Sequence, residues 1–236
     1  MAASILSNVP ILLGGQRLSC HTNTVGIDYG AETQDDTSFC DDTRSTLGGL
    51  KTVGFSAEGF YEGAADPALF NSMGVSGTLI SVANGQTVGD KAFSFVTVTG
   101  SYEPINGSVG DIAGFSINAS ARGDLGRGNV LFYDESLGSS TTGATFNAGS
   151  APNQITAFLH VFGVSGTSPT LDVTIESDTA DDFTGAEQTQ ITFDQATAQE
   201  AQRKTAGATS DTWWRVNATI GGTSPDFGFV VILILE

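Results

Sequence analysis

The hydrophobic and polar residues of this chain alternate with a period of two over much of its length. The alternation is clearest at 111–122, where small polar residues separate Ala113, Phe115, Ile117, Ala119 and Ala121. Successive side chains of a strand point to opposite faces, so this pattern predicts a strand with one buried face. Similar patterns predict further strands at 48–61, 78–82, 92–100, 155–164, 171–175, 188–193, 213–220 and 227–235.

One short helix is predicted between these strands, at 66–74. Asp66 can cap its first turn, Pro67 suits its start, and Gly74 stands where a left-handed residue commonly ends a helix. Its apolar patch consists of Ala68, Leu69, Phe70 and Met73. The segment 194–204 is compatible with a second short helix, whose apolar side is mostly alanine.

Glycine, proline and small polar residues predict where the chain turns. Residues 102–107 and 123–128 read as turns or loops. The tetrapeptide Gly-Thr-Ser-Pro occurs twice, at 166–169 and at 222–225, each time before a predicted strand. Shared turn chemistry explains four repeated residues better than duplication does, so we interpret both as the same kind of turn.

A domain boundary is predicted in the middle of the chain. Residues 135–152 consist largely of Gly, Ser, Thr and Ala, which is typical of a linker or long loop. This boundary divides the chain into a first β domain at 1–134 and a second, β-sandwich-like domain at 153–236. The fold class is therefore mainly β: a sandwich or barrel with one short helix, followed by a second sandwich-like half.

The composition supports this class and restricts the function. The 236 residues include 30 Gly and 15 Phe but only 9 Lys and Arg, against 26 Asp and Glu, for a formal charge of −17. Such a charge disfavours binding to phosphate backbones, because few cations are present to replace the counterions. Three interpretations are open: solubility, adaptation to a salty medium, or a negative surface along which a polyanion slides without sticking.

The two ends of the chain do not indicate a membrane segment. Residues 1–15 include the apolar run 9–13 but lack the basic region of a secretory signal, so we interpret them as mature sequence. The apolar stretch 227–235 is too short to span a bilayer as a helix and is rich in β-branched residues. A buried strand is the better interpretation.

Residues capable of catalysis are few. Cys20 and Cys40 are too few for a disulfide scaffold; they could pair, but buried or idle thiols are the preferred interpretation. The two histidines are His21, beside Cys20, and His160, which lies in an alternating strand and is expected to be structural. Neighbours on a strand face opposite ways, which argues against a Cys20–His21 dyad. We therefore expect no enzyme activity and no catalytic, cofactor-binding or metal-binding residues.

Two acidic clusters and one aromatic pair could still bind ligands. Asp35-Asp36 with Asp41-Asp42, and Asp178 with Asp181-Asp182, offer oxygen ligands for calcium, but neither has the spacing of a calcium loop and solvated turns are preferred. The pair Trp213-Trp214 could form a sugar platform. Adjacent strand positions face opposite ways, so one core tryptophan and one contact tryptophan are favoured.

Several motifs resemble the tail-tube, or major tail, proteins of long-tailed phages and archaeal viruses. In the first half these are Ala31-Glu32, Asp36-Thr37-Ser38-Phe39, Asp42-Thr43-Arg44, Leu47-Gly48-Gly49-Leu50-Lys51, Glu58-Gly59-Phe60, Gly110 to Phe115 and Arg127-Gly128. In the second half they are Gly163 to Val173 and Asp211 to Val216. The chain departs from the family pattern at Cys40, where members often have glycine after the aromatic residue.

The resemblance implies a structural virion protein. Its subunits would form rings, hexameric by preference or trimeric if the two halves are copies, and the rings would stack into a tube through which DNA passes without specific binding. Tape-measure and tail-terminator proteins are the implied partners, the virion tail is the implied location, and the host cytoplasm the implied place of assembly. A negative lumen would then explain the acidic charge. The alternative is a β-sandwich binding module, either carbohydrate-binding or a capsid decoration protein.

Overall fold

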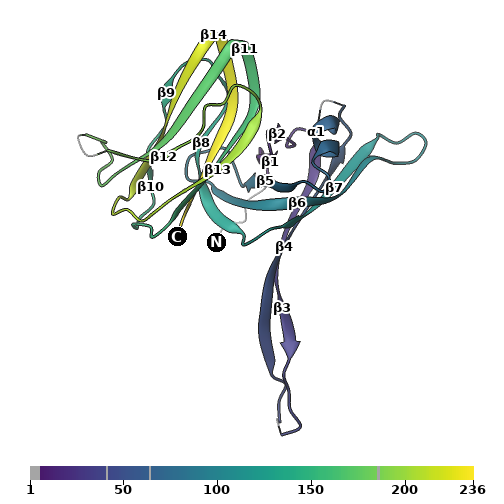
Figure 1. The fold of residues 1–236 in the computed structure, drawn as a ribbon. Coiled ribbons are helices and arrows are strands. Elements are labelled where there is room, and N and C mark those ends of the chain that lie inside the picture. Colours follow the sequence, from purple (N-terminus) through teal and green to yellow (C-terminus); the bar gives the residue numbers. More distant parts are fainter. Residues whose placement is uncertain (1–5, 41, 64, 185–186) are drawn as a thin grey trace. The chain divides into compact units, whose positions relative to one another are not determined.

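The computed structural model describes residues 6–40, 42–63, 65–184 and 187–236. The chain is mainly β, as predicted, with antiparallel ladders between its strands and one short helix, α1 (Asp66–Asn71). It divides into two compact units (Figure 1). Unit 1 comprises the described residues of 1–20, 79–94 and 126–236, and unit 2 comprises those of 21–78 and 95–125.

The chain passes between the units in β5 (Ser76–Ala83), in β6 (Lys91–Asn106) and near 20 and 125, rather than in the predicted linker. Residues 135–152 lie within unit 1. They contain the end of β8 (Gly126–Leu137) and two short strands, β9 (Thr141–Thr142) and β10 (Phe146–Asn147), which both pair with β14 (Trp213–Leu235). Backbone pairing holds part of this Gly- and Ser-rich stretch in place, which composition does not reveal.

Unit 2 is built on four strands in the order β3 (Thr22–Asp35), β4 (Thr46–Phe60), β7 (Gly114–Ala121) and the outer part of β6. Along β4 and β7 the predicted period of two appears as burial: Phe55, Ala57, Phe115, Ile117 and Ala119 are buried, whereas the residues between them are partly or fully exposed. One face of this sheet therefore faces a core, to which Leu69 of α1 also contributes.

The predicted helix is present, but Asp66 does not cap it. Ala65 holds the N-cap position without a side-chain hydrogen bond, and Asp66 is already helical. Its carboxylate instead accepts a hydrogen bond from the Tyr102 hydroxyl at 2.8 Å, which ties α1 to β6. Gly74 has the expected left-handed conformation, with φ of 69°.

The predicted turn at 102–107 is wrong, because β6 continues to Asn106 and pairs with β7 as far as Gly114. Proline and glycine in this stretch suggested a loop. Pro104 is accommodated between Glu103 and Asn106, where the register of the ladder shifts. A proline is tolerated at such an irregularity because it need not donate a hydrogen bond there. The turn predicted at 123–128 is shorter, since β8 begins at Gly126.

Unit 1 is a two-layered sandwich in which two long strands, β11 (Ile155–Asp178) and β14, belong to both layers. The first layer begins at one edge with β13 (Glu200–Ala206), which is followed by the first half of β11, the second half of β14 and β8. It continues with the first residues of β6 and the end of β5, and ends with β1 (Ile11–Leu13) and β2 (Gln16–Arg17). The second layer joins β12 (Gln188–Thr192), the second half of β11 and the first half of β14 with β9 and β10.

The two Gly-Thr-Ser-Pro segments are corners inside these long strands rather than turns between strands. They lie opposite each other in the β11–β14 ladder, where Thr167 pairs with Thr223 and the register shifts on both sides of Thr167. Gly166 and Gly222 have φ of 111° and 113°, and Ser168 and Ser224 both have φ of 48°. Repetition of one motif therefore bends two paired strands at the same point, from one layer to the other.

The helix considered at 194–204 is not formed. Residues 200–206 are β13, which pairs with β11 from Ile155–Ala206 to Val161–Glu200. Its residues are good helix formers, but the exposed edge of β11 offers a ladder of backbone hydrogen bonds. Tertiary pairing overrides the local preference here.

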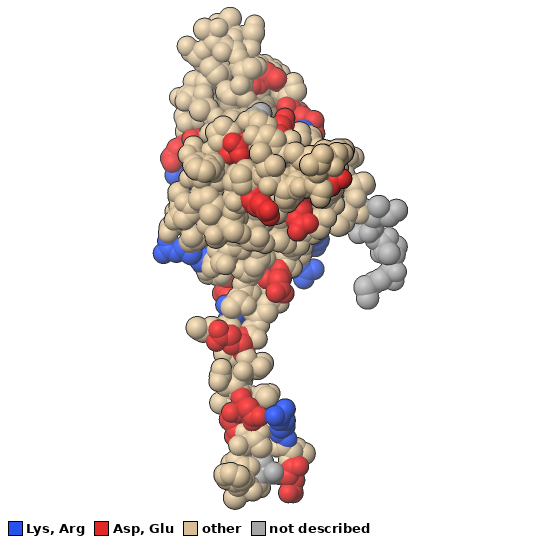
Figure 2. Space-filling model, turned by 90° about the vertical axis from the view of Figure 1, so that its right-hand side faces the viewer, with Lys and Arg blue, Asp and Glu red and all other residues tan. Residues whose placement is uncertain are grey.

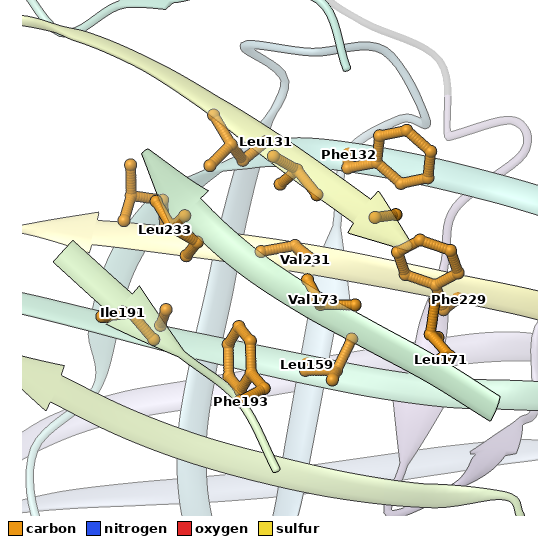
Figure 3. Close-up of a cluster of buried hydrophobic side chains, with 14 of the residues drawn as sticks. Leu131, Phe132, Leu159, Leu171, Val173, Ile191, Phe193, Phe229, Val231 and Leu233 are labelled. Carbon is orange, nitrogen blue, oxygen red and sulfur yellow. The ribbon is translucent and has the colours of Figure 1, made fainter. Parts of the chain in front are cut away.

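The sandwich core of unit 1 is apolar and drawn from both layers (Figure 3). Leu159, Val231 and Leu233 come from the first layer, and Leu171 and Val173 from the second. The C-terminal stretch 227–235 is the buried strand expected, with Phe227 to Ile234 all buried. Among the described residues, no helix is long and apolar enough to cross a membrane.

His160 is buried and hydrogen-bonded in unit 1. Its Nδ1 is 2.8 Å from the carbonyl oxygen of Gly14, and its Nε2 is 2.8 Å from Ser81 Oγ, which is 2.7 Å from Ser94 Oγ. A carbonyl only accepts, so Nδ1 carries the proton and donates, and Nε2 accepts from the Ser81 hydroxyl. Burial disfavours the charged ring and lowers the pKa of His160 to about 4.

This burial predicts acid sensitivity. Because the folded-state pKa lies below the ordinary 6.5, the contribution is complete above pH 6.5 and is lost as the pH falls toward 4. We expect the free energy of unfolding to drop by on the order of 3 kcal/mol across that range. Urea titrations at several pH values measure it. A His160→Gln variant has no titrating group at this position, so its free energy of unfolding should depend less on pH. If it falls with pH as steeply as in the unmodified chain, the acid sensitivity belongs to carboxylates instead.

Candidate functional site

The outer halves of β3 and β4 form a two-stranded arm that extends beyond the rest of unit 2 (Figure 1). Every described residue from Asp28 to Thr52 is exposed. The strands pair from Tyr29–Val53 outward to Asp35–Thr46, and beyond Val53 neither face of this ribbon is covered. An isolated ribbon of this kind is marginally stable in water, and a covering surface would stabilise it.

The end of the arm is closed by short polar interactions. The Thr37 amide donates to Asp35 Oδ1 at 2.9 Å, and the Ser45 amide donates to Thr37 Oγ1 at 3.0 Å. Hydrogen bonds from the Thr37 hydroxyl and from its backbone amide hold the pKa of the Asp35 carboxyl below its usual value. Nearer the base, a hydrogen bond with Tyr29 raises the pKa of Lys51. Acidic side chains are visible along the arm in Figure 2.

Large apolar side chains are exposed almost exclusively in unit 2. Of the 13 exposed large hydrophobic residues in the described chain, 12 belong to this unit. We call one group the arm surface: Tyr29, Phe39, Leu47 and Leu50. The second group, the loop surface, comprises Phe60, Tyr61, Phe70, Met73, Val75, Ile105, Val109 and Ile112, from the end of β4, α1 and its flanks, the end of β6 and the loop before β7.

Unit 2 also has two open sheet edges. Within the described residues β3 pairs with β4 alone, and β6 beyond Gly100 pairs with β7 alone. The unpaired amides and carbonyls along such edges can pair with a strand of another chain. The uncovered edges and the exposed apolar groups thus lie in the same unit.

The face of the unit 2 sheet opposite its core carries small polar and acidic side chains. The ladders align them in three rows across β3, β4, β7 and β6: Asp28, Gly54, Ser120 and Val98; Gly26, Ser56, Asn118 and Ser101; Thr24, Glu58, Ser116 and Glu103. These rows contain three carboxylates and no basic residue. We call this the acidic sheet face, and it has the character that repels a polyanion.

The other candidate residues are not brought together into a reactive site. Cys20 and Cys40 are free and exposed rather than buried, and Cys20 Sγ accepts a hydrogen bond from Arg17 at 3.1 Å. His21 Nε2 contacts the Glu62 carboxylate. His160 is inaccessible in the core, as the structural interpretation requires.

The acidic clusters and the tryptophan pair also have structural surroundings. Asp41 lies outside the described residues, and no group of three or more potential metal ligands occurs among those that are described. Asp178 is buried, whereas Asp181 and Asp182 are exposed. Trp214 is fully buried and Trp213 partly exposed, which confirms the opposite orientations predicted for neighbouring strand positions. The pair therefore does not form an exposed sugar platform.

Sequence reasoning did not predict the arm or the loop surface. The segment 22–35 lacks an apolar alternation, because both faces of the arm are exposed, and the exposed apolar residues are scattered along the sequence. The only available signal was the presence of Phe39, Leu47 and Leu50 within a polar stretch.

No family model and no curated protein matches the sequence. Among solved structures, the chain is similar to a protein of the native gene transfer agent virion, with 19% identity over 52% of this chain and 97% of that one and a TM-score of 0.41. It is similar to a protein of the empty gene transfer agent tail of C6 symmetry (18%; 44% and 80%; TM-score 0.35). It is also similar to a protein of the sheath–tube complex of an extracellular contractile injection system (12%; 55% and 93%; TM-score 0.43). The first two of these structures are a virion and a tail of gene transfer agents, and the third is a sheath–tube complex.

Proposed function

We propose that this chain is a structural subunit of a viral tail tube, in which copies of the chain join into rings and the rings stack. The observation that carries the proposal is the concentration of exposed apolar side chains in unit 2, on the arm surface and the loop surface. Groups of exposed apolar side chains on a monomer mark protein–protein interaction sites where they form a contiguous patch.

The two open edges support contacts between copies of the same chain. The edges belong to different strands, β3 and β6, so pairing of β3 in one copy with β6 in the next is a heterologous contact. Repeated contacts of this kind close into a ring or continue as a helix. In a ring the four-stranded sheets of unit 2 would join into one continuous barrel; six copies are preferred on the basis of the resemblance.

The acidic sheet face is the proposed lining of the channel. It would line the lumen, where the three carboxylates of these rows in each copy would keep duplex DNA from adhering. The implied setting is a virion tail, assembled in the host cytoplasm with tape-measure and tail-terminator proteins. DNA would pass without sequence recognition, and no enzymatic step is assigned to the chain.

Electron microscopy of the purified protein over a range of protein and salt concentrations tests this function. We expect rings or tubes with a central channel wide enough for duplex DNA, on the order of 20 Å or more, judged from the depths of its grooves. Salt should favour assembly, since it screens repulsion between acidic subunits. A protein that stays monomeric at high concentration under all these conditions would favour the alternative of a β-sandwich binding module.

A further inference from the structure

Unit 1 contains an open pocket of about 560 Å³ at one end of the sandwich, between the two layers. The ladders explain its position. Lys91 of β6, Asn129 of β8 and Leu233 of β14 form one row of the first layer, and Arg127 and Leu235 follow two positions further along their strands on the same face. Residues 146–148 and Ser150, which belong to β10 and its continuation, line the opposite side.

The charge of this pocket is opposite to that of the protein as a whole. Lys91 and Arg127 line it, and none of the described lining residues is acidic. Lys91 Nζ donates to Asn129 Oδ1 at 3.2 Å, and Asn129 Nδ2 donates to the Gly89 carbonyl at 2.6 Å, so Asn129 positions the lysine. The Arg127 guanidinium has neither an ion-pair nor a hydrogen-bond partner within the described chain.

The pocket also offers apolar surface and neutral donors. Phe146 and the two leucines contribute carbon surface. Asn147 uses its Oδ1 to accept from the Gly149 amide at 2.7 Å, which leaves its side-chain amide group to donate. Such a combination of apolar surface with a few convergent polar groups is typical of small-molecule sites. The donors here are cationic or neutral, so the complementary ligand is an acceptor with negative charge.

We propose that this pocket binds a saccharide unit that carries one carboxylate. The guanidinium of Arg127 and the ammonium of Lys91 would take the carboxylate, because planar guanidinium groups bind carboxylates in a bidentate manner. Asn147 would donate to a ring hydroxyl, and the apolar side of the sugar ring would lie on Phe146. The charge of −17 disfavours a long polyanion, whereas a single carboxylate suits two cations in a small pocket.

Titration of the isotope-labelled protein with methyl glucuronide, followed by NMR, tests this site. We expect shifts confined to the pocket and binding at least tenfold tighter than that of methyl glucoside, which has the same ring without the carboxylate. Sodium acetate and inorganic phosphate provide the anion without the ring. Equal binding of the glucoside, or of acetate or phosphate, would overturn the proposal, because either result removes the need for a carboxylate on a sugar.

Two variants locate the binding. Arg127→Gln and Lys91→Gln should each weaken glucuronide binding by tenfold or more, with unchanged thermal unfolding, since both side chains are exposed. Arg203→Gln removes the same charge from another exposed position of unit 1, where the guanidinium lies over the Phe158 ring at 5.9 Å, and should leave the affinity unchanged. An equal loss of glucuronide affinity in all three variants would show a general effect of charge and would contradict a specific binding site in this pocket. The pocket lies wholly in unit 1, so this test is independent of ring assembly.

Discussion

Replacing Leu47 and Leu50 by aspartate is expected to abolish assembly and leave the subunit folded. Both side chains belong to the arm surface, with 59% and 77% of their area exposed, so the monomer gains little from them. In a contact between copies, each buried leucine contributes about 1.5 kcal/mol or more. The loss of both leucines raises the concentration needed for assembly by about 100-fold at each contact. A buried aspartate adds a desolvation cost.

Sedimentation velocity and microscopy measure this loss, and thermal unfolding checks the fold. The matched control is Asn153→Asp with Thr205→Asp, which adds the same two charges at exposed positions of unit 1. We expect the control to assemble like the unmodified chain. Normal assembly of the leucine variant would remove the arm surface from the interface. Equal loss in both variants would attribute the effect to added negative charge, not to the arm.

The arm was harder to predict from the sequence than the core was. Residues 114–121 and 227–235 alternate or are uniformly apolar because a core covers them, and the burial of Phe115, Ile117, Ala119 and 227–234 agrees with the sequence pattern. Ala113, which the pattern placed on the same face, is exposed. Residues 22–35 form a strand of equal regularity without such a pattern, since its outer half has no core to face. What stabilises that strand is its ladder with β4, which is a relationship between segments rather than a property of either one.

The same limit applies to the long strands of unit 1. Glycine and proline at 166–169 and 222–225 correctly indicated a change of chain direction, but whether the chain turns back or bends within a strand depends on its partner. Because the two corners face each other, the ladder continues through both of them. A negative surface was one of three interpretations of the acidic composition, and only the register places Asp28, Glu58 and Glu103 on one side of one sheet.

The facing corners lead to the second large expected effect, in which Gly166→Ala and Gly222→Ala each destabilise unit 1 by about 3 kcal/mol or more. A β-carbon at Gly222 would lie 2.7 Å from the carbonyl oxygen of Ser168, and one at Gly166 would lie 2.6 Å from that of Ser224. Each glycine also has a φ that other residues rarely adopt, which adds about 1–3 kcal/mol. The obstacle in both cases is backbone held in a ladder, so it cannot move aside as a flexible side chain would.

Urea unfolding in dilute solution, where sedimentation shows a monomer, measures these losses. Gly207→Ala is the control, because that glycine lies in the same unit, is exposed, and has open space around its β-carbon position. It should change the free energy of unfolding by less than about 1 kcal/mol. Since each alanine forces the same two backbones apart, the double variant should lose less than the sum of the single losses. Fully additive losses would mean that the corners act independently, and a loss near zero for Gly222→Ala would contradict their close approach.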